Sequence, residues 1–584
     1  MKTFILTLIT LFFSSWVQSV VAGGSRVTVG AVGDLDCDFN SIQAAVDSGS
    51  AEIRLGHTAF NENIDLSNRQ SLSITGGYFN CADANNNSPA FFQTEISGIQ
   101  ALPVITINND NSSHATVNLY SLYISNGQEI PGAPGAGLFI SGNNTYVNAD
   151  DIRIIGNQGS GVGISNNLSG GVNLKNTFIL DNIAYDGGGI HCRNSNVQIY
   201  GSSDIYANEA IGSGTNAIDE GKGGGVYIGE GCSFNYFSGP PQIQSGLNGI
   251  NWNQANHHGG GVYIENGGDI YLYGQPQNFT EIDSTGDYPV TLIGNSADAD
   301  QNDSMTHGGA IYATGDHSVI TMRGVTVKQN TATGSGGGVA LFNLAELSIA
   351  RDPDQQCWSA EKCNFFSENQ SQNGGAVYAE GGATVNIRNA WLEANSANFG
   401  SAVYLTGVDT AGLIDGAVLF NNDLMPGNET VKTVVTALFG AELSVLFSTI
   451  ADHYVDTSVL ALLQAQMDLY GTLIFQDGNL PVAAHVNGIF TAECMYLYDG
   501  TELNGPDVVV GANDPFINRS SGDLHLNANN LALDGCAPHP QSTSRDMDNE
   551  QRGWDDPIPD LSGLFDIGAD ESYLSDVIFQ NNFE

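Results

Sequence analysis

The sequence predicts an all-β protein, a right-handed parallel β-helix with an N-terminal capping helix and a C-terminal cap. Three observations support this prediction: a glycine-rich repeat, a second repeat that ends in asparagine, and a turn-rich composition. Glycine accounts for 72 of the 584 residues, whereas only 14% of the residues are charged, as is typical of β proteins with many turns. Self-similarity at a period of roughly 20 to 50 residues indicates a stack of structural repeats.

The first repeat is a glycine triplet followed by a strand of alternating apolar residues. Clear copies are 187–192, 223–228 and 259–264, and looser copies begin at Gly308, Gly336, Gly374 and Gly400. Side chains alternate along a strand, so Val226 and Ile228 point to one side and Tyr227 to the other. We place the row of valines and isoleucines inside as a continuous apolar stack and the row of tyrosines outside.

The second repeat is an apolar residue, two variable positions and an asparagine. Its asparagines are Asn157, Asn182, Asn208, Asn253, Asn295, Asn330, Asn369, Asn395 and Asn421. Several successive copies are 25 or 26 residues apart, which is too short for a βαβ unit but fits one coil of three short strands. The other copies are 35 to 45 residues apart, and the excess falls in polar, glycine-rich stretches. We expect each asparagine to point inward at a turn and to bond its copies along the stack, with the glycines forming tight positive-φ corners.

The N-terminal region is predicted to contain a signal and a cap. Residues 1–22 resemble a secretory signal peptide, with Lys2 before an apolar run and small residues before a cut near Gly23. Residues 23–80 are expected to form the N-terminal cap and first coils, and Phe39–Val46 is predicted to be a short amphipathic helix opened by a polar cap. No transmembrane segment is predicted after signal removal, because Lys432, Gly440 and Glu442 interrupt the later apolar stretch.

The remaining chain divides by its repeat chemistry. Residues 81–407 carry the glycine and asparagine repeats, and residues 408–540 are expected to form further coils with another turn chemistry, in runs such as Leu443–Ile450 and Met467–Phe475. Residues 541–584 are expected to form the C-terminal cap and tail. Long polar insertions within the coils are predicted to be loops on one side of the stack.

Eight cysteines in an exported chain indicate disulfides. Their spacing favours sequential pairing, although about 105 connectivities are open to eight cysteines. The sequential pairs are Cys37–Cys81, Cys192–Cys232, Cys357–Cys363 and Cys494–Cys536. A zinc site is disfavoured because the chain has no CxxC pair.

The charge balance excludes some partners. The formal net charge is −46, from 17 basic and 63 acidic residues, so nucleic acid and anionic membranes would be repelled. A solvated acidic exterior is the simplest interpretation of this charge, and a glycan or a surface protein remains as the expected partner.

The combination of Gly-Gly-(Gly/Ala)-(Ile/Val) with apolar-x-x-Asn resembles the polymorphic outer-membrane-protein repeats and related β-helix proteins exported by bacteria. Ser41–Val46 with Gly76-Gly77-Tyr78 is similar to the start of these passenger domains, and Asp566–Glu571 to their end. The resemblance implies a secreted or cell-surface protein on the extracellular side of a bacterial envelope. The chain departs from the family because the residues after Glu571 are too few for the C-terminal membrane barrel.

Parallel β-helices also include pectin-lyase-like enzymes, so catalytic motifs are relevant. The Asn-Thr-Asp, Asp-Asp, Gly-His-Gly and Arg-Ile-Lys elements of galacturonases are missing as a set, and the adjacent aspartates 150–151 and 555–556 are predicted to lie in turns or the tail. A lyase base such as Arg193, Lys222, Arg323 or Lys328 has no clustered aspartate in sequence. Stacking of coils can still assemble a site from distant residues, but we expect no catalysis.

Two acidic runs resemble calcium-binding loops. Asp298, Asp300, Asn302 and Asp303 form the first run, and Asp546, Asp548 and Glu550 the second. The first lacks the glycine and the closing glutamate of an EF-hand. Solvated turn carboxylates are therefore favoured over calcium, and no other cofactor is predicted. His257, His258 and His307 precede glycine turns and are expected to be exposed.

The outward tyrosines are the candidate ligand-binding residues: Tyr227, Tyr263, Tyr312, Tyr378 and Tyr404. Aromatic faces at coil spacing could stack on sugars or anchor a protein; burial of the row under loops is the alternative, and it is favoured because large exposed aromatic patches are uncommon. The predicted function is an adhesin-like or glycan-binding protein without catalysis. A polysaccharide lyase or hydrolase is the first alternative, and a structural surface or matrix protein the second.

Overall fold

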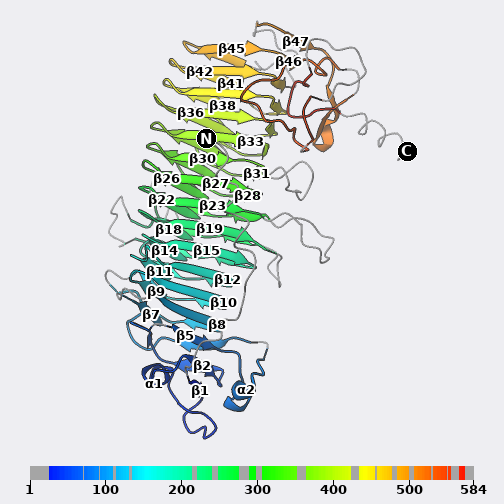
Figure 1. The fold of residues 1–584 in the computed structure, drawn as a ribbon. Helices are drawn as coiled ribbons and strands as arrows, with labels where there is room; N and C mark the ends of the chain where they lie inside the picture. The colour runs from blue at the N-terminus through cyan, green and yellow to red at the C-terminus, as the bar shows by residue number, and fades with distance from the viewer. Residues whose placement is uncertain are drawn as a thin grey trace, which may run out of the picture.

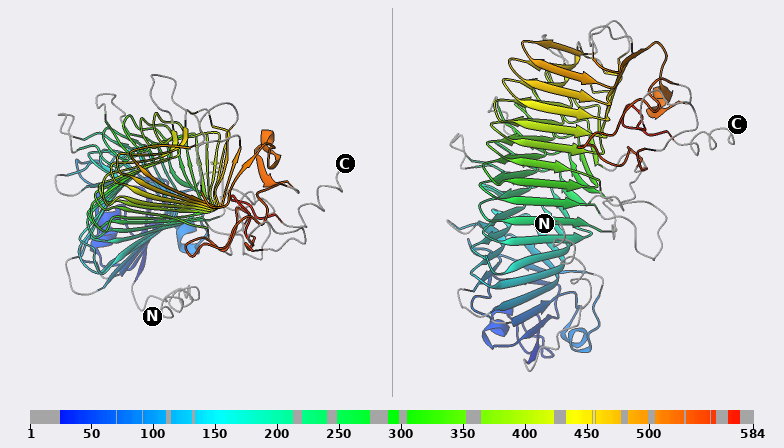
Figure 2. Two further views of the ribbon diagram at one scale, coloured as in Figure 1. Left: turned by 90° about the horizontal axis from the view of Figure 1, so that it is seen from above. Right: turned by 45° about the horizontal axis from the view of Figure 1, so that its top comes forward.

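The computed structural model describes residues 25–69, 71–90, 92–109, 114–130, 134–212, 220–239, 248–274, 289–297, 305–351, 364–422, 433–453, 455, 457–476, 483–498, 505–527, 530–548, 550–553 and 564–572. The chain forms the predicted right-handed parallel β-helix, whose coils stack along one axis (Figures 1 and 2). The predicted signal peptide, the predicted Cys357–Cys363 pair and the acidic run 298–303 lie outside the described residues.

One side of the stack is a 14-stranded parallel sheet. Each strand that follows a glycine repeat belongs to it, and neighbouring copies pair in register, as Val226 does with Val262. Its strands are β4 (Ile64–Asp65), β7 (Ile105–Asn108), β9 (Gly135–Ser141), β11 (Ser160–Ser165), β14 (Ile190–Arg193), β18 (Val226–Ile228), β22 (Val262–Glu265), β26 (Ile311–Thr314), β29 (Val339–Phe342), β32 (Val377–Glu380), β35 (Val403–Thr406), β38 (Thr433–Leu438), β41 (Thr457–Leu462) and β44 (Ala483–Val486).

The other strands of the coils form a 29-stranded sheet made of two ladders, which the long strands β8 (Ala115–Ser125), β10 (Thr145–Ile155) and β12 (Gly171–Leu180) join. The first ladder contains β1 (Arg26–Val29), β2 (Glu52–Leu55), β5 (Ser71–Thr75), β15 (Asn196–Gly201), β19 (Ser233–Ser238), β23 (Asp269–Tyr273), β27 (Val319–Arg323), β30 (Glu346–Ile349), β33 (Thr384–Arg388), β36 (Ala411–Asp415), β39 (Glu442–Leu446), β42 (Gln466–Tyr470) and β45 (Ile489–Glu493). The second contains β3 (Ala59–Asn61), β6 (Thr94–Ser97), β16 (Asp204–Tyr206), β20 (Gly249–Asn251), β24 (Val290–Ile293), β28 (Val325–Lys328), β31 (Asn364–Ser367), β34 (Ala390–Glu393), β37 (Val418–Phe420), β40 (Thr449–Ala451), β43 (Leu473–Phe475), β46 (Met495–Tyr498) and β47 (Val508–Gly511). Four coils add a two-residue strand after the asparagine turn: β13 (Ile183–Ala184), β17 (Glu209–Ala210), β21 (Gln254–Ala255) and β25 (Ser296–Ala297).

The core follows from the alternation of side chains. Val226 and Ile228 are fully buried and stack on Val262 and Ile264 of the next coil, and one continuous apolar cluster extends from Val29 to Leu497. The corner before each strand needs glycine. Gly223 has φ +68°, and a Cβ on Gly225 would lie 2.7 Å from the carbonyl oxygen of Gly261 in the next coil.

The repeat asparagines form a buried ladder along the stack. Asn182 shows its bonding: its Nδ2 donates to Asn208 Oδ1 at 2.9 Å and to the carbonyl of Ile154 at 3.1 Å, while its Oδ1 accepts from the amide and Nδ2 of Asn157. Each interior amide is thereby satisfied without water. The ladder contains Asn157, Asn182, Asn208, Asn253, Asn295, Asn330, Asn369, Asn395 and Asn422.

The last member of the ladder corrects one predicted position. Leu419, and not Val418, pairs with Leu392 in the preceding coil, so the inward asparagine is Asn422 rather than Asn421. The apolar-x-x-Asn motif fits both positions because Asn421 and Asn422 are adjacent, but Leu419 belongs to the inner apolar cluster, whereas Val418 packs in the second core. His453 Nδ1 accepts from the amide of Asn422 at 3.0 Å and continues the ladder.

The predicted capping helix is α1 (Ile42–Asp47). Ser41 is its N-cap, and Ile42, Ala45 and Val46 face the first coils. Glu62 accepts hydrogen bonds from the amides of Ile42 and Gln43 at 2.7 and 3.1 Å, which satisfies the open end of the helix. A second helix, α2 (Cys81–Asn86), begins at Cys81, which forms a disulfide with Cys37.

The C-terminal segment packs against the side of the last coils (Figures 1 and 2). It begins with a hairpin of β48 (Phe516–Asn518) and β49 (Asp523–Leu526), linked by the short helix η1 (Arg519–Ser521). We call residues 512–572 the C-terminal module. Its apolar side chains join Trp391, Phe447 and Phe475 in a second core.

Candidate functional site

The predicted tyrosine row exists, but its rings are buried. Tyr227, Tyr263 and Tyr312 share one register position on β18, β22 and β26, and Tyr378 pairs with Tyr404 in the same way. Their rings stack at centroid distances of 5.6, 5.1 and 5.3 Å for the three neighbouring pairs. The side chains are only 2% to 8% exposed, so a surface of open aromatic faces is not present at these five positions.

Other residues complete this aromatic ladder. Ala340 occupies the tyrosine position of β29, and Phe342 of the same strand fills the gap, 5.2 Å from Tyr312 and 5.4 Å from Tyr378. His191 extends the other end, 4.5 Å from Tyr227. Each stacked pair contributes about 1 kcal/mol beyond its buried area, so the ladder stiffens the outer face of the 14-stranded sheet.

Turn residues and cations cover the rings. His258 stacks on Tyr312 at 4.5 Å, and its Nδ1 accepts from the amide of His307 at 3.1 Å. Burial lowers the pKa of His258 to about 2 and that of His307 to about 4, so both are neutral acceptors. The expectation of exposed turn histidines at 257, 258 and 307 is wrong: His258 and His307 pack on the aromatic ladder, and His257 is only 8% exposed and stacks on His258.

The tyrosine hydroxyls hold a charged cluster in place. Tyr227 donates to Glu265 Oε1, and Tyr263 donates to Glu265 Oε2 at 3.3 Å. Arg193 donates to the Tyr227 hydroxyl at 2.5 Å and lies 3.6 Å from Glu265. The hydroxyls of the aromatic ladder therefore position Arg193 and Glu265. The sequence did not indicate that these two residues are close, because they lie on different strands, β14 and β22.

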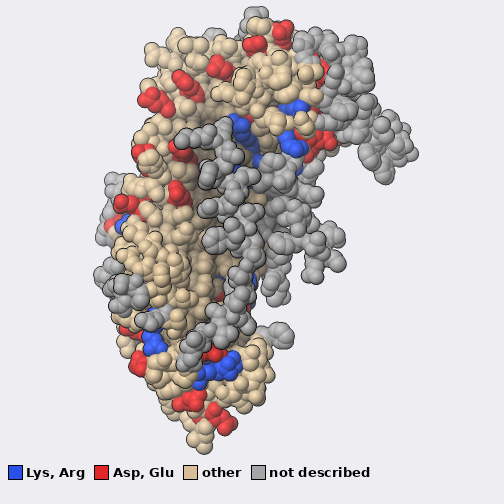
Figure 3. All heavy atoms as spheres, viewed as in Figure 1, with Lys and Arg blue, Asp and Glu red and all other residues tan. Residues whose placement is uncertain are grey.

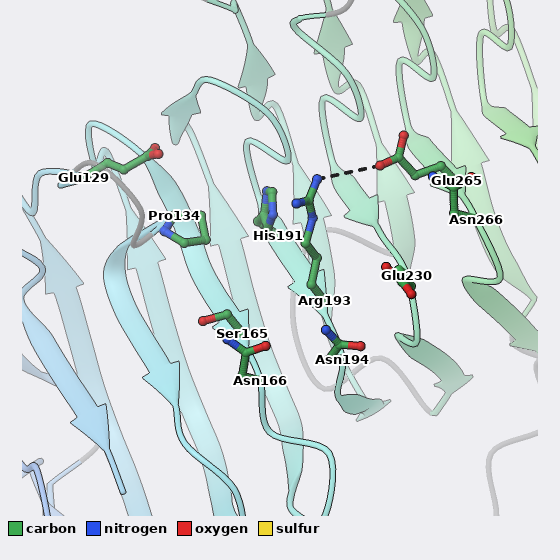
Figure 4. Close-up of a pocket in the computed structure, with 10 residues that line it drawn as sticks. All are labelled: Glu129, Pro134, Ser165, Asn166, His191, Arg193, Asn194, Glu230, Glu265 and Asn266. Atoms are coloured by element: carbon green, nitrogen blue, oxygen red, sulfur yellow. Dashed lines mark ion pairs between the residues drawn. The ribbon is translucent and has the colours of Figure 1, made fainter. Parts of the chain in front are cut away.

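Arg193 and Glu265 line a pocket of about 610 Å³ on the outer face of the 14-stranded sheet (Figure 4). It runs along the carboxyl ends of successive strands, which supply Ser165 and Asn166, Arg193 and Asn194, Glu230, and Glu265 and Asn266. Glu129 and Pro134 close the far side from the segment before β9, and His191 lies between the two sides.

The pocket has an acidic character. Burial, and then the charge of Asp186, raise the pKa of Glu129 to about 7. Burial also raises the pKa of Asp186, although the amide of Lys222 donates to it at 2.8 Å. Burial and the charge of Arg193 lower the pKa of His191 to about 3, so its imidazole is neutral.

The lining residues can make directional hydrogen bonds. Asn166, Asn194 and Asn266 each follow a strand and adopt φ between +49° and +54°, a conformation that asparagine tolerates well. The asparagine amides can both donate and accept hydrogen bonds, and an ionised glutamate carboxylate accepts them through two oxygens. Acidic side chains elsewhere are distributed along the visible face rather than gathered in one patch (Figure 3).

The predicted cysteine pairs are present where the structure describes them. Disulfides join Cys37 to Cys81, Cys192 to Cys232 and Cys494 to Cys536. Among the described residues, no cysteine is free and no helix is long and apolar enough to cross a membrane.

No family model and no curated protein matches the chain. Among solved structures, it is similar to tailspike protein 3 of bacteriophage CBA120, with 12% identity and a TM-score of 0.25. The match covers 81% of this chain and 59% of the tailspike chain, so the chain spans less than two thirds of that protein.

Proposed function

We propose that the protein is an exported, adhesin-like β-helix protein that binds a glycan in the pocket around Arg193. The observation that carries the proposal is the pocket itself, in which amide and carboxylate side chains project from consecutive strands. Sugar hydroxyls are recognised by such planar polar groups when these are held rigidly. Here the Tyr227 and Tyr263 hydroxyls fix Glu265, so the site needs little ordering on binding.

The charge of the lining favours a neutral glycan over a polyuronate. Glu129, Glu230 and Glu265 line the pocket with one arginine, Arg193, and the guanidinium already faces Glu265. An anionic sugar would meet more carboxylates than cations and would be repelled.

A glycan panel tests this proposal with the full exported chain. We expect retention of neutral oligosaccharides, weakened at least about tenfold by Arg193→Ala through lost contacts. Arg153→Ala is the matched control, since Arg153 is exposed on β10 outside the pocket. Preferential retention of uronates would contradict the charge argument. Failure to retain any glycan would contradict the binding function and would favour a structural surface protein instead.

One observation favours a second candidate, a glycoside hydrolase. Glu129, whose pKa of about 7 suits a general acid, lies close enough to Asp186 for the charge of that carboxylate to raise its pKa, and hydrolysis uses two carboxyl groups on either side of the scissile bond. Analysis of the retained glycans for new reducing ends separates the two functions. Cleavage that Glu129→Gln abolishes while retention persists would establish the enzyme, whereas intact glycans support binding alone.

We propose the extracellular face of a bacterial envelope as the site of action and the polymorphic outer-membrane-protein passengers as relatives of the repeat. The disulfides support an oxidising compartment, and the Gly-Gly-Gly and asparagine repeats support the relationship. Protease shaving of intact cells tests the location: loss of the protein from shaved cells is expected, and its protection would contradict a surface location.

A further inference from the structure

Three distant segments of the C-terminal module meet at His525. His525 on β49 lies between two aspartates, with its Nδ1 2.6 Å from Asp523 Oδ1 and its Nε2 2.8 Å from Asp548 Oδ2. Asp570 of the last described segment joins them. One ligand atom from each of His525, Asp548 and Asp570 lies within 4.8 Å of the other two, a separation that one bound ion can close, because metal–ligand bonds are about 2.0 to 2.2 Å long.

Two buried carboxylate oxygens here lack partners among the described residues. Asp570 is 2% exposed; its Oδ2 accepts from the amide of Leu526 at 2.7 Å, but its Oδ1 has no hydrogen bond. Asp546 is fully buried; its Oδ1 accepts from the amides of Asp548 and Glu550, but its Oδ2 has none. A buried charged oxygen without a partner is costly, and such oxygens are normally paired or bound to a metal.

The surroundings of the cluster are arranged as in metal sites. Asp523 contacts Nδ1 of His525 and would fix the ring with Nε2 toward the ion, the carboxylate–histidine arrangement that orients metal ligands. Asp546 holds the loop that carries Asp548 through two backbone amides. His525 and Asp548 are 22% and 17% exposed, which leaves a path for an ion from solvent.

We propose that His525 Nε2, Asp548 and Asp570 bind a divalent cation of the zinc or manganese class. A mixed imidazole and carboxylate set favours these ions over calcium, which takes oxygen ligands. The ion would fasten β49, the loop at 546–550 and the segment at 564–572 to one another. It differs from the calcium considered for the acidic run Asp546, Asp548 and Glu550, since the ligands His525 and Asp570 come from other segments.

Metal titration of the full exported chain, stripped with a chelator and dialysed, tests this proposal. Calorimetry with Zn²⁺, Mn²⁺ and Ca²⁺ should show a site for Zn²⁺ or Mn²⁺ that raises the melting temperature. Asp570→Asn, which keeps an acceptor for the Leu526 amide, should weaken that binding at least about 100-fold. Glu346→Gln, at the exposed first position of β30, is the matched control and should bind as the parent does.

A second variant keeps the test decisive if Asp570→Asn does not fold. Asp523→Asn keeps an oxygen acceptor for the backbone amide of His525 but removes the carboxylate that contacts its Nδ1, and should weaken binding about tenfold. The proposal is overturned if the parent binds neither Zn²⁺ nor Mn²⁺, if Ca²⁺ binds more tightly than both, or if neither aspartate variant changes the affinity.

Discussion

The repeat body and the C-terminal module solve the burial of polar groups in different ways. In the body, each buried asparagine bonds the same atoms of its copy in the next coil, so one local pattern satisfies the whole ladder. In the module, buried groups such as Arg552 and Glu571 meet partners from unrelated segments, and Arg552 donates to the carbonyls of Gly568 and Ala569 at 3.0 and 2.7 Å. Polar groups in the repeat body are therefore buried by one repeated pattern of hydrogen bonds, whereas each buried polar group in the C-terminal module depends on its own long-range contact.

The largest expected effect comes from breaking the asparagine ladder. Asn253→Ala leaves the amide and Nδ2 of Asn208 without acceptors inside the core, and each such group costs about 1 to 3 kcal/mol. With the cavity, we expect a loss of about 5 kcal/mol in the free energy of unfolding. Urea denaturation measures it. Asn235→Ala on β19, whose amide bonds only Ser233 of its own strand, should change stability little; equal effects would contradict the ladder.

A buried carboxyl in the body gives a pH-dependent effect. Burial raises the pKa of Asp204 to about 7, although Asn251 Nδ2 donates to it at 3.1 Å. Above about pH 4 the Asp204 carboxyl loses its proton in the unfolded state but keeps it in the folded state. The free energy of unfolding therefore falls as the pH rises from about 4 to 7. Asp204→Asn should be more stable than the parent by up to about 4 kcal/mol at pH 8 and equal at pH 4. Melting curves at both pH values test this; an equal difference at both would contradict it.

Removing one disulfide from each region compares the stability of the two regions directly. Replacing Cys494 and Cys536 with serine removes a covalent tie between the last coils and the module, and we expect a loss of about 3 kcal/mol. Hydrogen exchange should then increase in residues 530–548 while the ladder asparagines stay protected. The matched pair Cys192 and Cys232 lies inside the body, and its removal should leave exchange in the module unchanged. Loss of protection throughout the chain in the first variant would show that the two regions are one cooperative unit.

The smallest effect concerns one polar contact between the regions. Asn389 Nδ2, at the edge of β34, donates to the carbonyls of Arg545 and Asp546 at 3.2 and 3.0 Å. Asn389→Ala should cost about 2 kcal/mol, because alanine loses these bonds and is strained at φ +47°, and it should accelerate exchange locally around 543–547. Asn343→Ala is the control, because Asn343 has a similar φ of +52° but its amide donates to Thr314 in a neighbouring coil. Unchanged exchange at 543–547 would mean that the contact does not hold the module.

The sequence predicts the body well because its information is periodic. The repeated features are the glycine corners, the asparagine ladder and the inward row of Val226 and Ile228. They recur often enough to be identified without knowing which residues contact one another. Where two asparagines are adjacent, the pattern fits both, and the prediction chose Asn421 instead of Asn422. The capping helix at Ile42–Asp47 was also predicted, since Ser41 and three apolar residues define it locally.

The candidate sites could be predicted only in part. The tyrosine row was identified, but alternation along a strand does not show that neighbouring rings, His258 and Lys222 cover it. Arg193 and Glu265 are brought together by the stacking of β14, β18 and β22, and no local sequence motif indicates that they are close. His525 and Asp570 come together only through the irregular path of the module. Stacking register, had it been extended from the core rows to the ends of the strands, would have placed Arg193 near Glu265.

The most direct test of the glycan-binding account is a crystal structure of the chain with a neutral oligosaccharide that the panel retains. The account predicts the sugar in the pocket, with hydroxyls bonded to Asn194, Asn266 and Glu265, and the tyrosine rings beneath it unmoved. A sugar bound on another face, or a pocket that stays empty of it at saturating ligand, would contradict the account.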